Sequence, residues 1–262
     1  MATPTLHINQ PRLGDEQSLS DRAYYAIREW IVTLELAPGS VVSERDMMER
    51  LGVGRTPVRE ALRDLAREQL VEVFPRRGIF VSTVDVGDIA GLSEVRRVLE
   101  SQAARLAAER RNAGDLAATE ALLDELAQGV AMQGVDAPRD REAGAFRDVP
   151  RRRRGSSGGL PPRGGPLADK SAERGLIDLD QRIHRHVYRC THNPFLEATL
   201  EEYYVLTLRI WFLALDRVER LDAAVHEHHE ILEAIRDGDA DRAEEVMRRH
   251  ITSFEGAMRA VL

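Results

Sequence analysis

Cysteine is almost absent from this chain of 262 residues, in which Cys190 stands alone. An internal disulfide is therefore excluded, and the composition favours the cytoplasm, a reducing compartment. Aromatic residues are scarce at 5%, so we expect an aliphatic, alanine-rich core of the kind that helical bundles have. No apolar run approaches the roughly 18 residues of a membrane helix, and the N-terminal stretch lacks the regions of a signal peptide. We therefore expect no membrane partner.

Excess positive charge is also lacking, because the formal net charge is −7. This argues against a protein that binds nucleic acid over its whole surface. Residues 43–77 hold eight Arg against seven acidic residues, a net charge of only +1. Specific DNA binding needs a local basic face rather than a basic protein. Any basic face must therefore lie on a different side of the same helices from the acidic residues, because no whole domain is basic.

A helix-turn-helix pattern occupies residues 43–65. A short helix over residues 43–51 ends at Gly52, and a second helix follows. One face of the second helix carries apolar residues at helical spacing: Val58, Ala61, Leu62 and Leu65. Another face carries arginines every fourth residue, with Thr56 beside them: Arg55, Arg59 and Arg63. Taken alone, this basic face is compatible with a solvated helix surface or with a helix that enters a DNA groove.

A basic hairpin follows the second helix. Two apolar, β-branched runs flank Pro75-Arg76-Arg77-Gly78, which predicts two strands and a turn. A further helix, from Ser20 to about Leu36, is expected to pack behind the other two. Together these elements predict a winged helix-turn-helix over residues 18–83, preceded by a flexible arm at residues 1–17.

These motifs resemble the DNA-binding domain of GntR-family bacterial transcription regulators. The likeness rests on Ser43-Glu-Arg-Asp, on Leu51-Gly-Val-Gly-Arg-Thr-Pro-Val-Arg-Glu-Ala-Leu62 and on the hairpin tip. Gly54 departs from the usual Ser or Thr, and Gln69 from a common Gly. A homodimer would place two recognition helices on the half-sites of a palindromic operator. The predicted contacts with double-stranded DNA are Arg45, Arg55, Thr56, Arg59, Arg77 and Gly78.

Residues 84–262 have the periodicity of an all-α bundle of some six helices. Helices are expected from about Asp85 to Leu106, Asp115 to Val130, Leu176 to Arg189, Pro194 to Leu215, Arg217 to Asp237, and Asp239 to the end. Between them, residues 134–174 are rich in Pro, Gly, Ser and Arg, which predicts a disordered insertion. A phosphate-binding Arg run and a reading-frame error are alternatives for this segment. The predicted fold class is mainly α, a winged helix-turn-helix followed by a helical bundle.

Four polar side chains interrupt the apolar stripes of three bundle helices: Asp180, His184, His228 and His250. Each would carry a desolvation cost of a few kcal/mol if it were buried without a partner. One Asp and three His suit a divalent metal such as Zn²⁺, Ni²⁺ or Mn²⁺. A hydrogen-bonded cluster without metal is the alternative.

Arg96 also falls on an apolar stripe, between Leu92 and Leu99. It can reach solvent from the edge of the core, or pair with an acid such as Glu100 in a neighbouring helix. The functional alternative is a guanidinium that receives the carboxylate of an effector.

The segments around these residues are similar to the FCD effector domain of FadR-type GntR regulators. That resemblance implies a metal held by Asp180, His184, His228 and His250, a small organic-acid effector near Arg96, and a homodimer. The predicted function is a ligand-responsive regulator of transcription, with repression favoured. A metalloenzyme and a ligand-free structural dimer are the alternatives, although His-Glu-x-x-His and Glu-x-x-His motifs are absent from the sequence.

Overall fold

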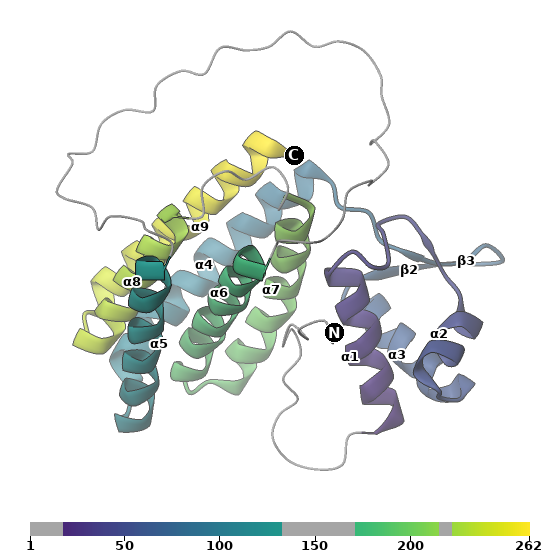
Figure 1. Ribbon diagram of the computed structural model, residues 1–262, viewed down its shortest axis with the longest axis horizontal. Coiled ribbons are helices and arrows are strands. Elements are labelled where there is room, and N and C mark those ends of the chain that lie inside the picture. Colours follow the sequence, from purple (N-terminus) through teal and green to yellow (C-terminus); the bar gives the residue numbers. More distant parts are fainter. Residues whose placement is uncertain (1–17, 133–170, 215–221) are drawn as a thin grey trace, which may run out of the picture.

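The computed structural model describes residues 18–132, 171–214 and 222–262. Figure 1 shows a small winged part beside a larger bundle of helices. The winged part contains α1 (Leu19–Val32), β1 (Val41–Val42), α2 (Glu44–Leu51), α3 (Arg55–Arg67), β2 (Val71–Phe74) and β3 (Gly78–Val81). Its antiparallel sheet has the order β1-β3-β2. β1 is missing from the prediction because a strand of two residues is too short to show alternation.

α1 begins and ends earlier than its sequence suggested. The N-cap is Ser18, whose side chain and backbone exchange hydrogen bonds with Asp21 in a capping box. The helix ends at Val32, and Leu34 takes a left-handed conformation with φ 63°. The expected helix from Ser20 to Leu36 was therefore wrong at both ends. Leu34 is buried in this turn, so its apolar side chain belongs to the core although it is not part of the helix.

The recognition helix α3 has the predicted buried face. Val58, Ala61, Leu62 and Leu65 are all buried. Gly52 ends α2 in a left-handed conformation, and Gly54 is the N-cap of α3 without a side-chain hydrogen bond. Gln69 also has a positive φ, 60°, which explains why glycine is favoured there.

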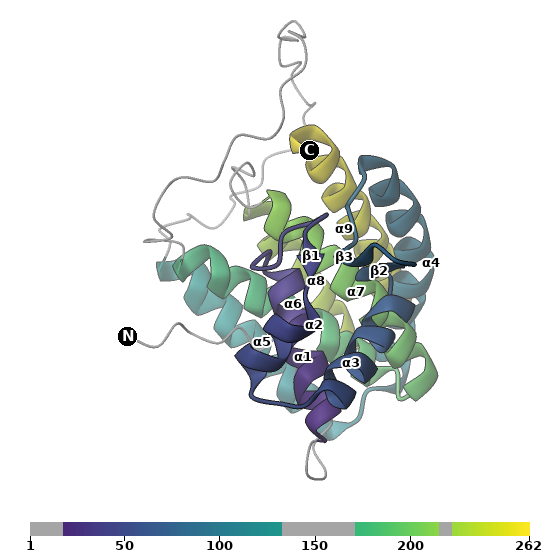
Figure 2. The same cartoon turned by 90° about the vertical axis from the view of Figure 1, so that its right-hand side faces the viewer.

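The bundle consists of α4 (Val86–Arg110), α5 (Ala113–Met132), α6 (Ser171–Cys190), α7 (Pro194–Ala214), α8 (Asp222–Asp237) and α9 (Ala240–Val261). α4 and α9 run side by side, as Figures 1 and 2 show. α6 begins about a turn before the expected Leu176, because residues 171–174 are helix formers ahead of Gly175. The rest of the predicted insertion at 134–174 lies outside the described residues, as does the arm at 1–17.

The buried face of α4 differs from the predicted apolar stripe. Leu92, Leu99 and Leu106 are only half-buried. Ile89, Arg96 and Ala103 of that stripe are buried, and apart from Ile89 the buried positions of α4 are small or polar: Ser93, Arg96, Glu100, Ser101, Ala103, Ala104, Ala107 and Ala108. Small side chains let neighbouring helices approach closely, and the polar ones carry the chemistry described below.

A single hydrophobic cluster extends through both parts of the chain. It joins Ile27 and Leu65 of the winged part to Tyr204 and Leu208 of α7, and α1 packs against α7. The two parts therefore share a core. None of the described helices has the length and hydropathy of a membrane span.

Candidate metal centre and nucleic-acid interface

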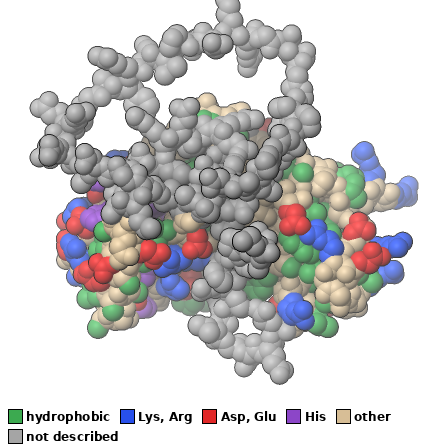
Figure 3. All heavy atoms as spheres, in the orientation of Figure 1, with side chains coloured by type: hydrophobic (Ala, Val, Ile, Leu, Met, Phe, Trp, Pro, Cys, Tyr) green, Lys and Arg blue, Asp and Glu red, His purple; other side chains and the backbone are tan. Residues whose placement is uncertain are grey.

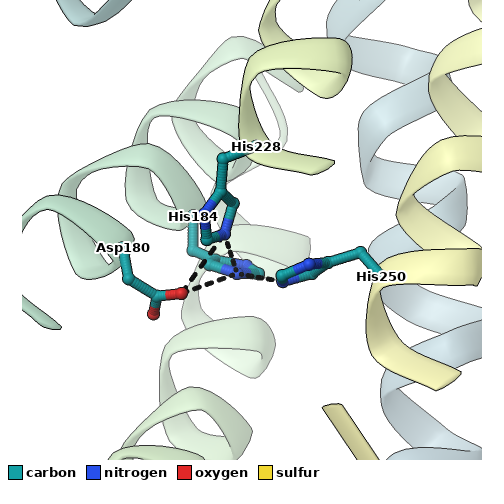
Figure 4. A group of neighbouring side chains, drawn as sticks. All are labelled: Asp180, His184, His228 and His250. Atoms are coloured by element: carbon teal, nitrogen blue, oxygen red, sulfur yellow. Dashed lines mark hydrogen bonds and ion pairs between the residues drawn. The ribbon is translucent and has the colours of Figure 1, made fainter. Parts of the chain in front are cut away.

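The four predicted metal ligands converge from three helices, as Figure 4 shows. Asp180 and His184 lie one turn apart on α6, His228 on α8 and His250 on α9. All four are buried, and their donor atoms lie within 4.8 Å of one another. Sequence periodicity therefore identified a real three-dimensional cluster.

The spacing of the donor atoms suits a metal ion. The Nε2 atom of His184 lies 3.3 Å from that of His250 and 3.4 Å from that of His228. The Nε2 atom of His228 lies 3.2 Å from Oδ1 of Asp180. A tetrahedral ion with bonds of about 2.0–2.1 Å separates its ligands by about 3.3–3.4 Å. Three edges of the cluster match that geometry.

Carboxylates orient two of the imidazole rings from behind. Nδ1 of His184 lies 2.7 Å from Oε2 of Glu100, and Nδ1 of His250 lies 3.0 Å from Oε2 of Glu227. Each Nδ1–H donates to its carboxylate, which leaves the lone pair of Nε2 directed at the centre. Tyr204 of α7 similarly donates its hydroxyl hydrogen to Oδ2 of Asp180.

The pKa shifts agree with this arrangement. Burial raises the pKa of Glu100, but Arg96 and His184 act more strongly in the opposite direction and bring that pKa to about 2. Burial likewise opposes a lowered pKa in Glu227, where the hydrogen bond from His250 prevails. Burial and the neighbouring His228 lower the pKa of His250 to about 4. The charged carboxylate of Glu227 therefore faces a neutral His250, and neutral imidazole is the form that binds metal.

The donor set fits a divalent cation on physical grounds. The lone pairs of His184 and His250 face each other at 3.3 Å, and two acceptors without a hydrogen between them repel. A cation placed between them removes that repulsion and compensates the buried charge of Asp180. The residues that would hold it are Asp180, His184, His228 and His250.

Arg96 pairs with Glu100, but within one helix rather than between two. Its Nε lies 2.5 Å from Oε1 of Glu100, one turn further along α4. The expected placement of Glu100 in a neighbouring helix was therefore wrong. Glu100 bridges Arg96 to His184, so Arg96 is connected to the cluster through one carboxylate. Among the described residues, its buried Nη1 has no hydrogen-bond partner.

The roles of three residues of the site were not predicted from the sequence. Glu100 was considered only as a partner of Arg96, and no role was assigned to Glu227 or Tyr204. Glu227 directly precedes His228, so it lies beside the apolar stripe and not on it. An acidic residue adjacent to an inward His was the available signal for Glu227. No sequence signal placed Tyr204 against Asp180, because that contact depends on how α7 packs.

The predicted DNA contacts lie on the surface of the winged part. Arg55, Thr56 and Arg59 are exposed in the first turns of α3. Arg59 forms an ion pair with Glu44 of α2, with Nε at 2.9 Å and 3.0 Å from the carboxylate oxygens. Arg45 is 85% exposed and pairs with Glu49 on the same helix at 2.8 Å. Arg55 has no ion pair among the residues that the structure describes.

The hairpin carries the remaining predicted contacts at its tip. Arg77 and Gly78 are exposed where β2 turns into β3, and Gly78 has φ 111°. A side chain other than glycine is strained at that angle. Figure 3 shows basic side chains (blue) along the edge of the molecule formed by the hairpin and α2. The predicted segregation of charge by face is incomplete, because Arg45 and Arg59 pair with Glu49 and Glu44 on the same surface.

Two family models match this chain. The model described as bacterial regulatory proteins, gntR family, matches residues 19–81. The model of the FCD domain matches residues 91–147 and 166–253, so the unmatched gap lies inside the predicted insertion. The chain belongs to the GntR family and carries an FCD domain. The winged part is the GntR domain and the bundle is the FCD domain. The fold class predicted from the sequence is confirmed.

Relatives of this GntR protein span most of its length. An HTH-type transcriptional regulator of Streptomyces ambofaciens is 31% identical over 236 residues, 87% of this chain and 80% of that protein. The HTH-type transcriptional repressor RspR of Escherichia coli is 23% identical over 96% of this chain and 94% of its own. The structure of E. coli McbR/YncC has the same fold, with a TM-score of 0.69 at 19% identity, covering 93% and 98% of the two chains. The matched family and the first two relatives are regulators of transcription and not enzymes, so the metalloenzyme alternative is wrong.

Proposed function

We propose that this GntR regulator is a repressor that binds a palindromic operator as a homodimer in the cytoplasm. We further propose that its affinity for DNA depends on a metal and a small carboxylate effector in the bundle. The observation that carries the proposal is the exposed basic turn of α3 on a chain whose bundle buries a three-His, one-Asp cluster. The repressor function of RspR, a relative over nearly the whole chain, supports the sign of regulation.

The proposed DNA reader is the N-terminal turn of α3 with the hairpin beside it. Arg55 is an exposed cation without an ion pair among the described residues, so it can meet a guanine without first losing a partner. Arg59 must leave Glu44 to do so, and Arg45 must leave Glu49. We therefore assign base reading to Arg55, shared base or phosphate contact to Arg59, and backbone contacts to Arg45, Thr56, Arg77 and Gly78.

The proposed sensor is the metal cluster together with Arg96. The ligands are Asp180, His184, His228 and His250, and the ion is Zn²⁺, Ni²⁺ or Mn²⁺. An ion that takes more than four ligands, as Ni²⁺ and Mn²⁺ do, would offer a further coordination position to an anionic ligand. Arg96 retains an unpartnered N–H at Nη1, which can donate to the carboxylate of the effector. The metal and Arg96 are linked through Glu100, so one ligand can affect both.

The experiment is operator binding measured by fluorescence anisotropy across a salt series. The probe is DNA from upstream of the protein's own gene, with scrambled DNA as the reference. Arg55→Ala should cost about 1–3 kcal/mol on the operator and little on scrambled DNA. Arg63→Ala is the matched control, because Arg63 belongs to the same run but lies two turns further along α3.

Equal losses for the two variants, on both DNAs, would contradict the assignment of Arg55 as a base reader. The metal is tested separately, by elemental analysis of the purified protein and by repeating the titration after dialysis against a chelator. Operator affinity that chelation leaves unchanged, in a protein shown to have lost its metal, would remove the metal from the regulatory proposal but not the DNA reader.

A further inference from the structure

The winged part and the bundle line a cavity of about 910 Å³ where they meet, and one side of this cavity is open to solvent. Figures 1 and 2 show the elements around it, the base of the hairpin, the start of α4 and the middle of α7. Much of its wall is apolar: Val71, Val84, Leu92, Leu206 and Ile210. Neither the four donors of the metal cluster nor Arg96 line it. It is therefore a separate site.

A buried arginine without a counterion lies in this wall. Arg209 of α7 is 2% exposed. Its Nη1 donates to Oγ of Ser82 at 2.8 Å and its Nη2 donates to the carbonyl oxygen of Ser82. Its buried Nε–H has no hydrogen-bond partner in residues 18–132, 171–214 and 222–262. Within the described parts of the chain no carboxylate pairs with it, and burial lowers its pKa to about 10.

Comparison with Arg96 shows what Arg209 lacks. Both are fully buried, but Arg96 has the charge of Glu100 at 2.5 Å, whereas Arg209 has only the neutral acceptors of Ser82. A buried cation is costly unless an anion compensates it. An unused donor and an uncompensated charge beside an apolar cavity are complementary to a ligand with one carboxylate and an apolar body.

We propose that the junction cavity is a second ligand site, which binds a small apolar monocarboxylate through Arg209. The carboxylate accepts hydrogen bonds from the guanidinium, and the apolar body lies along Leu92, Leu206 and Ile210. Glu72 and Asp88 also line the cavity and are exposed. Their charges repel a second carboxylate, so the site discriminates against dicarboxylates.

This ligand would bear directly on the hairpin. Ser82 follows β3, and its Oγ donates to the carbonyl oxygen of Gln69 at 2.6 Å, in the turn before β2. Arg209, Ser82 and Gln69 thus form a chain of hydrogen bonds from α7 to the base of the hairpin. A carboxylate on Arg209 competes with Ser82 for the same guanidinium, so its binding changes how the hairpin is held.

The site also permits a variant that fills it without removing Arg209. Gly91 of α4 lines the cavity, and a Cβ added there meets nothing within 4 Å. Gly91→Phe should therefore occupy the cavity without disturbing its wall. Gly256 is equally open but lies on α9, away from the cavity, so Gly256→Phe is the matched control.

The test is isothermal titration calorimetry of the full-length protein with octanoate, with octanedioate as the dianionic analogue. Wild type and Gly256→Phe should bind octanoate saturably and alike. Arg209→Gln and Gly91→Phe should each weaken binding at least about tenfold, and octanedioate should bind wild type at least about tenfold more weakly. Thermal melts of each variant establish that it is folded.

Three results would overturn the proposal. The first is the absence of saturable octanoate binding to wild type at millimolar concentrations. The second is binding that survives both Arg209→Gln and Gly91→Phe. The third is binding that Arg96→Gln abolishes and Gly91→Phe does not, which would place octanoate at the metal cluster.

Discussion

Gly54 begins the recognition helix without the side-chain oxygen that most helices have at this position. Its φ of −74° and ψ of 178° suit an N-cap of any residue type, and no atom lies within 4 Å of an added Cβ. The backbone N–H groups of the first turn therefore lack a side-chain acceptor at the end of α3 that we propose faces DNA. The defect is local and can be repaired by one substitution.

Gly54→Ser should stabilise the protein by a few tenths of a kcal/mol, roughly the difference between serine and glycine at an N-cap. The measurement is urea denaturation followed by circular dichroism. Gly54→Ala adds the same Cβ without an oxygen, and we expect it to be about 1 kcal/mol less stable than Gly54→Ser. Equal stability of the two variants would mean that the cap contributes nothing here.

Glu227 illustrates how a residue outside the predicted ligand set can control it. Its carboxylate fixes the ring of His250 from behind and also accepts a hydrogen bond from Ser253 at 2.8 Å. Glu227→Gln should weaken zinc binding about 10- to 100-fold, the usual effect of losing such a partner. The measurement is competition against a chelating dye.

Glu230→Gln is the control for this variant, because Glu230 lies one turn further along α8 and pairs with Arg249 instead of a metal ligand. A loss of zinc affinity that is the same in both variants would show a general effect of charge. Wild-type affinity in Glu227→Gln would contradict its role in orienting His250.

At the scale of elements, the close packing of α4 against its neighbours depends on alanine side chains. Ala103, Ala104, Ala107 and Ala108 are fully buried, and α4 packs closely along α9. Ala107→Leu should lower the free energy of unfolding by about 1–3 kcal/mol, because the added methyl groups have no space. Gln102→Leu, on the exposed side of the same helix, should change it little. Urea denaturation compares the two, and equal effects would contradict close packing at Ala107.

The periodicity of apolar residues predicted a helix and its buried face well where one face of the helix is apolar and the other is polar. α3 is the clearest case, since all four predicted apolar positions are buried. It succeeded only in part on α4, where Ile89, Arg96 and Ala103 of the predicted stripe are buried but its three leucines are half-buried. The same principle found the metal cluster, because Asp180, His184, His228 and His250 each interrupt a good stripe.

Contacts between elements could not be predicted in this way. The hydrogen bond from Tyr204 to Asp180 joins α7 to α6, and that from Arg209 to Ser82 joins α7 to the hairpin. Each depends on the angle at which two helices or parts pack, which the pattern of one element does not encode. The strand β1 was too short to show alternation, and Val41 and Val42 are recognisable as a strand only through their pairing with β3.

At the scale of the whole molecule, the proposed homodimer needs an apolar surface. Val98 of α4 is 67% exposed, and Val95 on the same helix is 36% exposed. We propose that these valines lie in the dimer contact, so Val98→Glu should shift the protein from dimer to monomer by placing a charge in an apolar surface. The measurement is light scattering after size-exclusion chromatography.

Phe195→Glu is the comparison, because Phe195 is the most exposed large apolar side chain of the described residues, at 84%, and lies at the start of α7. We expect it to remain a dimer. A monomer with Phe195→Glu and a dimer with Val98→Glu would move the interface from α4 to the start of α7.

The shared core has an evolutionary consequence. A protein family that combines one DNA-binding domain with many effector domains can exchange these domains only where a simple linker connects them. Here α1 lies against α7, and Arg209 reaches across to Ser82. A change of side-chain volume in α1 must be compensated by a change in α7, and the reverse. The sequences of α1 and α7 should therefore covary among descendants of this chain. The winged part and the bundle will have diverged together. A winged part moved onto the bundle of another family member would present a surface that does not fit that bundle.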